Sequence, residues 1–165
     1  MKLVTTFQMR AIEKEADSKG ISYAQMMDNA GKGLAEIVHA IGQENDSRSV
    51  TGIVGSGNNG GDTLVALAWL AQAGWRTHAY LVHRKTADDE FVIRYLKAGG
   101  EIAQFANDAG FNTLRAFLEE SNLLLDGLLG TGIKLPLRNE AALVLQGVAL
   151  ILSDLELLPI IIAVD

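Results

Sequence analysis

The spacing of apolar residues changes along this chain near residue 50. From there onward, short uninterrupted apolar runs alternate with longer segments in which apolar residues recur at helical spacing. Uninterrupted runs are typical of parallel strands that are covered on both faces. The pattern predicts strands at 50–54, 77–82, 101–105, 122–126 and 159–165, with helices between them at 62–73, 87–98, 112–120 and 140–153.

Repeated strand–helix–strand units with right-handed crossovers build a doubly wound sheet. We therefore predict an α/β fold of the Rossmann-like kind, an αβα three-layer sandwich around a mostly parallel sheet. The strand order 3-2-1-4-5 would place the carboxyl ends of the first, fourth and fifth strands side by side, where such folds bind their ligands.

Two helices are predicted ahead of the sheet. Residues 5–8 and 22–25 each have the form of a capping box, in which a hydroxyl residue is followed three positions later by glutamine. The first helix would end at Gly20 and the second at Gly42. Their expected buried faces comprise Met9, Ile12 and Ala16 in the first helix, and Met27, Ala30, Leu34, Ile37 and Ile41 in the second.

The segment 54–62, which reads Val-Gly-Ser-Gly-Asn-Asn-Gly-Gly-Asp, is the most informative part of the chain. It joins the first strand to the next helix, and its glycines let the backbone approach a ligand closely. The helix start offers unpaired N–H groups and the positive end of a dipole. Gly55, Gly57 and Gly60 have the G-x-G-x-x-G spacing of dinucleotide sites, which is weak evidence by itself. The polar residues Asn58, Asn59 and Asp62 are less usual, since phosphate alone would not call for an acid.

Two more polar groups follow predicted strands. Asp126 leads into the loop 127–136, and Asp165 ends the last strand. Each feature also has a purely structural interpretation. Glycines after a strand often form only a tight turn, Asp62 and Asp126 suit a helix cap or turn cap, and Lys134 alone reads as a solvated surface lysine.

A length of 165 residues allows one domain that buries about two thirds of the surface of its unfolded chain. We therefore expect residues 1–165 to form a single domain. The final apolar strand would be left uncovered, so we also expect this domain to be truncated at its C-terminal end.

Composition and net charge limit the kinds of partner that this chain is expected to bind. The formal net charge of −6 argues against nucleic acid and anionic membranes, because both reward clustered Lys and Arg. The chain has no cysteine, which excludes a disulfide framework and a cysteine nucleophile and fits a reducing compartment. With no signal peptide and no apolar run long enough to span a bilayer, we expect a cytoplasmic protein.

Several motifs resemble those of the NAD(P)HX epimerase family, also called the YjeF N-terminal domain family. The resemblance extends over essentially the whole chain in the right order. The motifs are Gln8-Met9-Arg10, Met27-Asp28-Asn29-Ala30-Gly31, Gly57-Asn58-Asn59-Gly60-Gly61-Asp62, Asp126-Gly127-Leu128-Leu129-Gly130-Thr131-Gly132 and Ala163-Val164-Asp165.

This resemblance implies an isomerase that interconverts the R and S forms of hydrated NADH or NADPH. A partner dehydratase, which is fused in many bacteria, would then consume the product, and a homodimer through the N-terminal helices is implied as well. The family's catalytic positions match Asp165 and Lys134, and its potassium ligands match Asn59 and Asp126. Its substrate-binding positions match Asn58, Asn59, Gly60, Gly61, Asp62, Gly130, Thr131, Gly132, Ile133, Lys134, Leu135, Pro136 and Asp165.

Two other functions fit parts of the sequence. An NADP-dependent oxidoreductase domain would use the G-x-G-x-x-G spacing and the basic residues His83, Arg84 and Lys85, which follow the second strand where a 2′-phosphate would bind. The chain offers no evident substrate domain for that reaction. A non-catalytic binding or scaffold module of the same fold is the other alternative, although a scaffold needs no acids at its strand ends.

Overall fold

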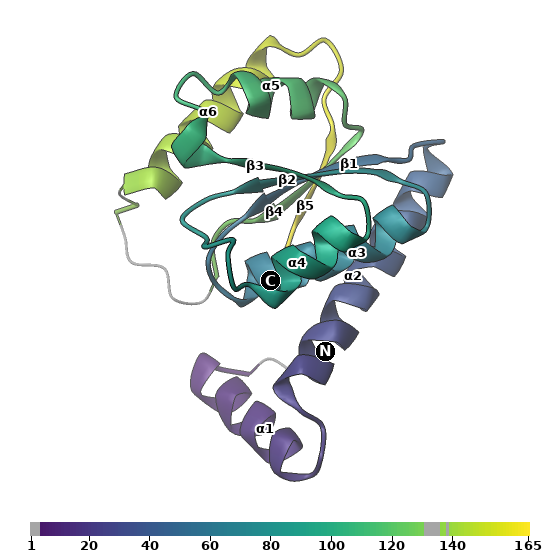
Figure 1. Cartoon of the computed structure of the whole chain (residues 1–165), viewed down its shortest axis with the longest axis vertical. Coiled ribbons are helices and arrows are strands. Elements are labelled where there is room, and N and C mark those ends of the chain that lie inside the picture. The colour runs from purple at the N-terminus through teal and green to yellow at the C-terminus, as the bar shows by residue number, and fades with distance from the viewer. Residues whose placement is uncertain (1–3, 131–135, 138) are drawn as a thin grey trace.

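In the computed structural model, which describes residues 4–130, 136–137 and 139–165, five parallel strands form the middle layer of the molecule (Figure 1). Their order is β3-β2-β1-β4-β5, which confirms the predicted order. The strands are β1 (Ser49–Val54), β2 (Arg76–Leu81), β3 (Glu101–Gln104), β4 (Leu123–Gly127) and β5 (Ile160–Ala163).

Helices cover both faces of this sheet, so the predicted three-layer α/β fold is confirmed (Figure 1). One face carries α2 (Tyr23–Glu44), α3 (Asn58–Gln72) and α4 (Glu90–Lys97), and the other carries α5 (Asn112–Glu119) and α6 (Asn139–Asp154). A short 3-10 turn, η1 (Phe105–Asn107), follows β3. Successive residues of a strand point to opposite faces of the sheet and so contribute to two hydrophobic cores. Leu123 and Leu125 pack towards α3, and Leu124 packs towards α5 and α6.

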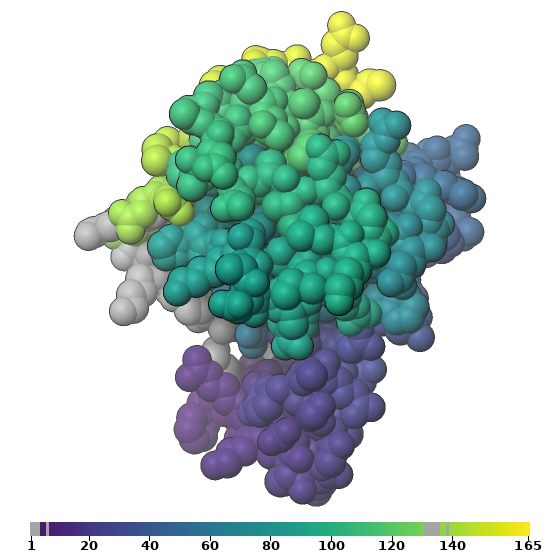
Figure 2. All heavy atoms as spheres, viewed as in Figure 1, coloured from purple at the N-terminus to yellow at the C-terminus, as the bar shows by residue number. Residues whose placement is uncertain are grey.

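The N-terminal helix α1 (Thr6–Ser18) stands away from the sandwich with the start of α2 (Figures 1 and 2). The predicted capping box is complete at Thr5, whose backbone N–H donates to Gln8 Oε1 at 2.8 Å while its Oγ1 accepts from the Gln8 N–H at 3.3 Å. Gly20 ends this helix as predicted, with a φ of 93° that favours glycine. At α2, Ser22 accepts from the Gln25 N–H at 3.2 Å, which is the first half of a capping box.

The predicted buried face of α1 is wrong, and that of α2 is right only in part, since Leu34 and Ile41 do pack against the core. Met9 and Ile12 on α1 are 45% and 50% exposed, because α1 lies outside the sandwich. On α2 the residues that are buried are Gly31, Ala35, Val38 and Gly42, while Ile37 is 56% exposed. Small residues of α2 face α3 and Trp75, because Val65 of α3 and Trp75 pack directly against the backbone of Gly31 and Gly42. The helix therefore continues past Gly42 to Glu44 instead of ending there.

Helix α3 begins at Asn58, four residues before the predicted start at Asp62. Gly57 is its N-cap, so most of the glycine segment is the first turn of a helix and not a loop. Glycine has a low helix propensity, which is why the sequence predicts a loop here. In the folded chain, the close contact between Gly60 and the backbone of Gly55 overrides that propensity.

Among the described residues, no helix is both long enough and apolar enough to cross a membrane.

Candidate functional site

The carboxyl ends of β1, β4 and β5 meet at one edge of the sheet, with the first turn of α3 against them. The contact is made between backbones. A Cβ atom on Gly60 would collide with the backbone of Gly55, and one on Gly127 would collide with Thr63. The Gly55 amide also donates to the Gly127 carbonyl at 3.1 Å. Glycine is needed here because a side chain would push the helix start away from the strands.

Asn59, the second residue of α3, joins the three strand ends. Its Nδ2 atom donates to the carbonyl of Leu129 at 2.8 Å and to the carbonyl of Val164 at 2.6 Å. These partners follow β4 and β5, so one half-buried amide holds both loops to the helix start. Its Oδ1 atom makes no hydrogen bond within the described part of the chain and remains an acceptor without a donor.

Asp126 and Asp165 lie beside this amide. Asp126 pairs with Ala163 across the β4–β5 register, and its carbonyl accepts from the Val164 N–H at 3.0 Å. The Oδ1 atom of Asp126 accepts from the Leu128 N–H at 3.2 Å, which fixes the turn after β4. Asp165 follows directly after Val164 and is exposed. Two carboxyl groups and one amide therefore stand at a single edge of the sheet.

Asp62 contributes a third carboxyl group from the second turn of α3. Its Oδ1 atom is buried and has no hydrogen-bond partner among the residues that the structure describes. Burial raises the pKa of this carboxyl from 3.8 to about 6, because the charged form loses hydration and gains no partner. Buried polar atoms are nearly always paired in folded proteins, so this unpaired atom in α3 is a candidate contact for a polar ligand.

The remaining predicted positions divide into four groups. Asn58 and Pro136 are exposed, while Gly60 and Gly61 are buried and pack against neighbouring elements. The first helical hydrogen bond of α3 runs from the Gly61 N–H to Gly57, which leaves the amides of residues 58–60 outside the helical ladder. Gly130 lies within van der Waals distance of the Asn59 side chain. The predicted positions Thr131, Gly132, Ile133, Lys134 and Leu135 lie outside the described residues.

Arg84, which follows β2, supports the glycine segment, a role that the sequence did not reveal. Its side chain is only 7% exposed. The Nη1 atom donates to the carbonyls of Gly55 at 2.9 Å and Gly57 at 3.4 Å, and Nε donates to Asp89 at 2.8 Å. Asp89 in turn caps α4 through the Phe91 N–H. The basic cluster after β2 signalled an anion site, and nothing in the spacing distinguished Arg84 from its neighbours.

Metal binding depends on the oxygen atoms at this edge. Within the described residues, no group of three or more His, Cys, Asp or Glu would hold a metal ion. A hard monovalent cation takes a different donor set of amide, carboxylate and backbone oxygens. The Oδ1 atom of Asn59 and the carboxylate of Asp126 match that donor chemistry, and the Leu129 and Val164 carbonyls already point to the same amide.

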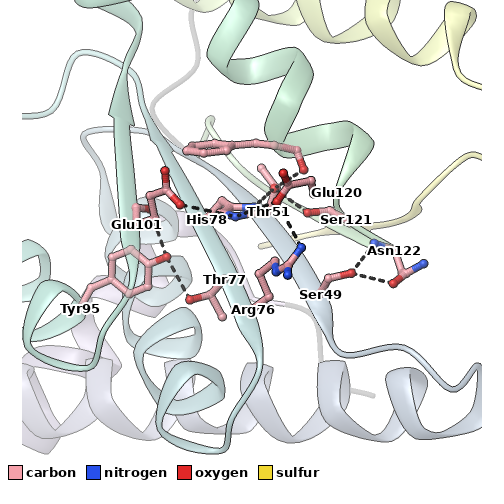
Figure 3. Close-up of polar contacts among 11 residues, drawn as sticks. Ser49, Thr51, Arg76, Thr77, His78, Tyr95, Glu101, Glu120, Ser121 and Asn122 are labelled. Carbon is pink, nitrogen blue, oxygen red and sulfur yellow. Dashed lines mark hydrogen bonds and ion pairs between the residues drawn. The ribbon is translucent and has the colours of Figure 1, made fainter.

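A second polar cluster occupies the opposite, amino-terminal edge of the sheet (Figure 3). There His78 is buried and stacks on Phe117 with ring centroids 4.3 Å apart. Its Nδ1 atom lies 3.4 Å from Thr51 Oγ1, and its Nε2 atom lies 3.8 Å from carboxylate oxygens of both Glu101 and Glu120. This cluster lies at the other end of the strands from Asn59 and is separate from the candidate site.

A doubly wound parallel sheet, with a glycine-rich helix start and acids at adjacent strand ends, defines a class of nucleotide-binding α/β proteins. Comparison with known families narrows this class. The family model described as YjeF-related protein N-terminus matches residues 23–165, and the chain belongs to this family.

Curated relatives carry related names. The chain is 31% identical over 140 residues to the "Bifunctional NAD(P)H-hydrate repair enzyme Nnr" of Archaeoglobus fulgidus, covering 84% of this chain and 27% of that protein. It is 31% identical over 144 residues to the "NAD(P)H-hydrate epimerase" of Elusimicrobium minutum, covering 81% of this chain and 63% of that protein. The chain thus spans less than two thirds of either relative.

A solved structure supports the fold. The crystal structure of yeast ynu0, YNL200c, superimposes on this chain with a TM-score of 0.77, covering 100% of this chain and 70% of the yeast chain. The sequences are 21% identical, so this likeness concerns the arrangement of helices and strands.

Proposed function

We propose that the chain is an NAD(P)H-hydrate epimerase, an isomerase that interconverts the R and S forms of NADH or NADPH hydrated at the C5=C6 bond of the nicotinamide ring. The observation that carries this proposal is the Asn59 amide, which holds the loops after β4 and β5 to the glycine-rich start of α3. This arrangement sets Asp126 and Asp165 beside a helix N-terminus, where a dinucleotide phosphate binds well. Family membership and the names of the relatives support the same reaction.

The chemistry follows from the position of the hydroxyl group. It sits on the carbon next to the ring nitrogen, whose lone pair assists cleavage of the C–O bond. A protonated Asp165 gives its proton to the hydroxyl, the C–O bond breaks, water leaves, and the nitrogen lone pair forms a C=N⁺ bond. Water then adds to the opposite face of the ring, and the Asp165 carboxylate takes the released proton. We assign Lys134 to stabilise the negative charge that develops on the Asp165 carboxylate when it gives up its proton.

The same proposal gives roles to the other predicted positions. The backbone amides at 58–60 and the segment Gly130 to Pro136 would hold phosphate and ribose from two sides. A potassium ion would be held by Asn59 and Asp126, and its charge would offset that of the bound phosphates. Asp62 would gain a polar partner from the substrate for its unpaired Oδ1 atom.

Partners follow from the reaction. An epimerase of this kind supplies one epimer to a dehydratase, either a separate protein or one fused in the same chain. We also propose a homodimer through the N-terminal helices, because apolar side chains on α1 are exposed to an unusual degree. The most exposed are Phe7 at 82%, Ile12 at 50% and Met9 at 45%.

Epimer exchange is the direct test. Purified S-hydrate of NADPH is mixed with the protein, and formation of the R-hydrate is followed by chromatography. We expect Asp165→Asn to slow exchange by roughly 100-fold or more, as removal of a general acid does. The matched control is Asp154→Asn, because Asp154 pairs with Arg115 at 2.9 Å on the helix layer formed by α5 and α6. Exchange at an undiminished rate in Asp165→Asn would refute the assignment.

The oxidoreductase alternative is tested in the same preparation. That alternative predicts hydride transfer, and so a loss of absorbance, when the protein meets intact NADPH and a carbonyl acceptor. We expect no such change. A scaffold function would leave both measurements negative in the wild-type protein.

A further inference from the structure

A separate cleft opens at the carboxyl ends of β2 and β3, next to the candidate site. It has a volume of about 240 Å³, with His83, Arg84 and Lys85 after β2, Gln104 at the end of β3, and Glu140 at the start of α6 among the residues that line it. In doubly wound folds that bind pyrophosphate after β1, the end of β2 is where the adenosine ribose lies. The cleft therefore lies at the position expected for the far end of a dinucleotide.

The side chain of Arg84 lies between the cleft and the glycine-rich segment 54–62. Arg84 lines the cleft, and its Nη1 atom donates to the carbonyls of Gly55 and Gly57 at 2.9 and 3.4 Å. The Val82 N–H donates to the Val54 carbonyl at 2.9 Å, which keeps the ends of β1 and β2 together. A ligand whose phosphates rest on the start of α3 would reach the cleft across this one side chain.

The charges around the cleft favour an anion. At this position an acid after β2 accepts from the 2′-hydroxyl of NAD, whereas a basic residue accommodates the 2′-phosphate of NADP. Here the residues after β2 are basic. Arg84 is committed to Asp89 and the glycine carbonyls, so Lys85 is the cation left to meet a ligand, with the exposed His83 ring beside it at the cleft. His83 adopts a φ of 53°, which turns the chain at the mouth of the cleft.

One acidic residue, Glu140, also lines the cleft. Glu140 comes from α6 and not from β2, and its Oε2 atom lies 3.3 Å from His83 Nδ1. This pair offsets the carboxylate charge whenever His83 carries a proton. Lys85 makes no ion pair within the described residues and supplies the net positive charge of the cleft.

We propose that this cleft binds the 2′-phosphoadenosine end of the substrate, with Lys85 and His83 on the 2′-phosphate, so that hydrated NADPH is preferred to hydrated NADH. The inference rests on the proposed function for the identity of the substrate. It adds a subsite and a specificity that the candidate site does not contain.

Fragment binding tests the subsite apart from catalysis. Titration calorimetry compares adenosine 2′,5′-bisphosphate with adenosine 5′-monophosphate, two fragments that differ only in the 2′-phosphate. We expect the wild-type protein to bind the 2′,5′-bisphosphate about tenfold more tightly, the ratio that one charge-assisted hydrogen bond provides. Lys85→Ala should abolish this ratio. The control is Lys97→Ala, an exposed lysine in the last turn of α4 that should leave the ratio unchanged.

The outcomes test the proposed subsite and the proposed reaction separately. Equal affinity for the two fragments in the wild-type protein, or an unchanged ratio in Lys85→Ala, overturns the subsite even if epimer exchange is observed. Weaker binding of adenosine 5′-monophosphate in Glu140→Gln would show that the cleft recognises the 2′-hydroxyl, and this result would also overturn the subsite. The expected ratio without epimer exchange would refute the proposed reaction while leaving the subsite in place.

Discussion

A single carboxyl group illustrates the conflict between stability and ligand binding in this protein. Asp62 lies on a well-packed helix, yet its Oδ1 atom is buried without a described partner. The ionised form is disfavoured by burial, which raises its pKa to about 6. Residues of this kind are retained when a ligand uses them, because replacing them usually stabilises a protein at the expense of function.

Replacement of this group should therefore stabilise the fold in a pH-dependent way. An acid whose pKa is raised on folding loses protons first in the unfolded state, so its cost appears above pH 3.8 and is complete above about pH 6. We expect Asp62→Asn to raise the free energy of unfolding by about 1–2 kcal/mol at pH 7.5, after allowance for partial solvent screening. The gain should disappear near pH 4. Urea unfolding at the two pH values measures both.

The control for this substitution is Asp88→Asn, which changes an exposed carboxyl group in the loop before α4. It should show no comparable dependence on pH. If Asp62→Asn were no more stable than the wild-type protein at pH 7.5, the unpaired carboxylate would not carry the cost assigned to it. We also expect the variant to lose epimer exchange, since we propose that this group binds the substrate.

At the scale of elements, the fit of α3 against the strands depends on glycine at one position. A Cβ atom on Gly60 would meet the backbone of Gly55, which cannot move aside as a flexible side chain would. We expect Gly60→Ala to destabilise the fold by about 1–3 kcal/mol, the range for overpacking. Gly33→Ala on α2 is the matched control, because a Cβ atom there meets nothing within 4 Å.

The two substitutions should shift stability in opposite directions. In a helix with open space around the residue, alanine is favoured over glycine by about 0.5–1 kcal/mol, so Gly33→Ala should raise the denaturation midpoint. Chemical denaturation at pH 7.5 compares them. A stable Gly60→Ala variant would mean that the helix start can shift, and the backbone contact would then not be the reason for the glycines.

Element boundaries show what the sequence could and could not provide. The strand order and the meeting of three strand ends could be predicted, because uninterrupted apolar runs and alternating helices leave few parallel arrangements. The start of α3 could not be predicted, because Gly60 and Gly61 read as a loop until Gly55 is seen to pack against Gly60 and Met27 against Gly61. The exposed face of α1 was missed for a similar reason, since periodicity shows that a face is apolar but not what covers it.

At the candidate site, sequence and structure contribute different things. The positions of Asn59 and Asp126 followed from the glycine segment and the end of a strand. The use of both Asn59 amide protons on neighbouring loops depends on tertiary geometry that no local pattern contains. The support that Arg84 gives to Gly55 was invisible for the same reason.

At the scale of the whole molecule, the cluster around His78 links β1, β2 and β3 to the end of α5, at the edge of the sheet opposite the candidate site (Figure 3). Thr51 Oγ1 lies 3.1 Å from the Phe117 carbonyl, 2.8 Å from Ser121 Oγ and 3.4 Å from His78 Nδ1. The other ring nitrogen of His78, Nε2, lies 3.8 Å from carboxylate oxygens of both Glu101 and Glu120. Protonation would put a charge on a ring that is buried against Phe117.

The balance of forces on His78 sets how global stability depends on pH. Burial lowers the pKa of its imidazole below 6.5, with Glu101 and Glu120 opposing the shift and Arg76 adding to it. A histidine with a lowered folded pKa is protonated first in the unfolded state. The free energy of unfolding should therefore be constant above pH 6.5 as far as this residue is concerned, and should fall as the pH drops below that value.

We expect His78→Gln to remove this part of the pH dependence. Between pH 7.5 and pH 5.5 the wild-type protein should lose more stability than the variant, by at most about 1.4 kcal/mol per pH unit, which is the limit for one proton. His83→Gln, at an exposed ring, should follow the wild-type curve. Urea unfolding across this range separates the two. If wild type and His78→Gln were parallel, Glu101 and Glu120 would stabilise the charged ring enough to cancel the cost of burial, and the cluster would be an ion pair instead of a neutral hydrogen-bonded core.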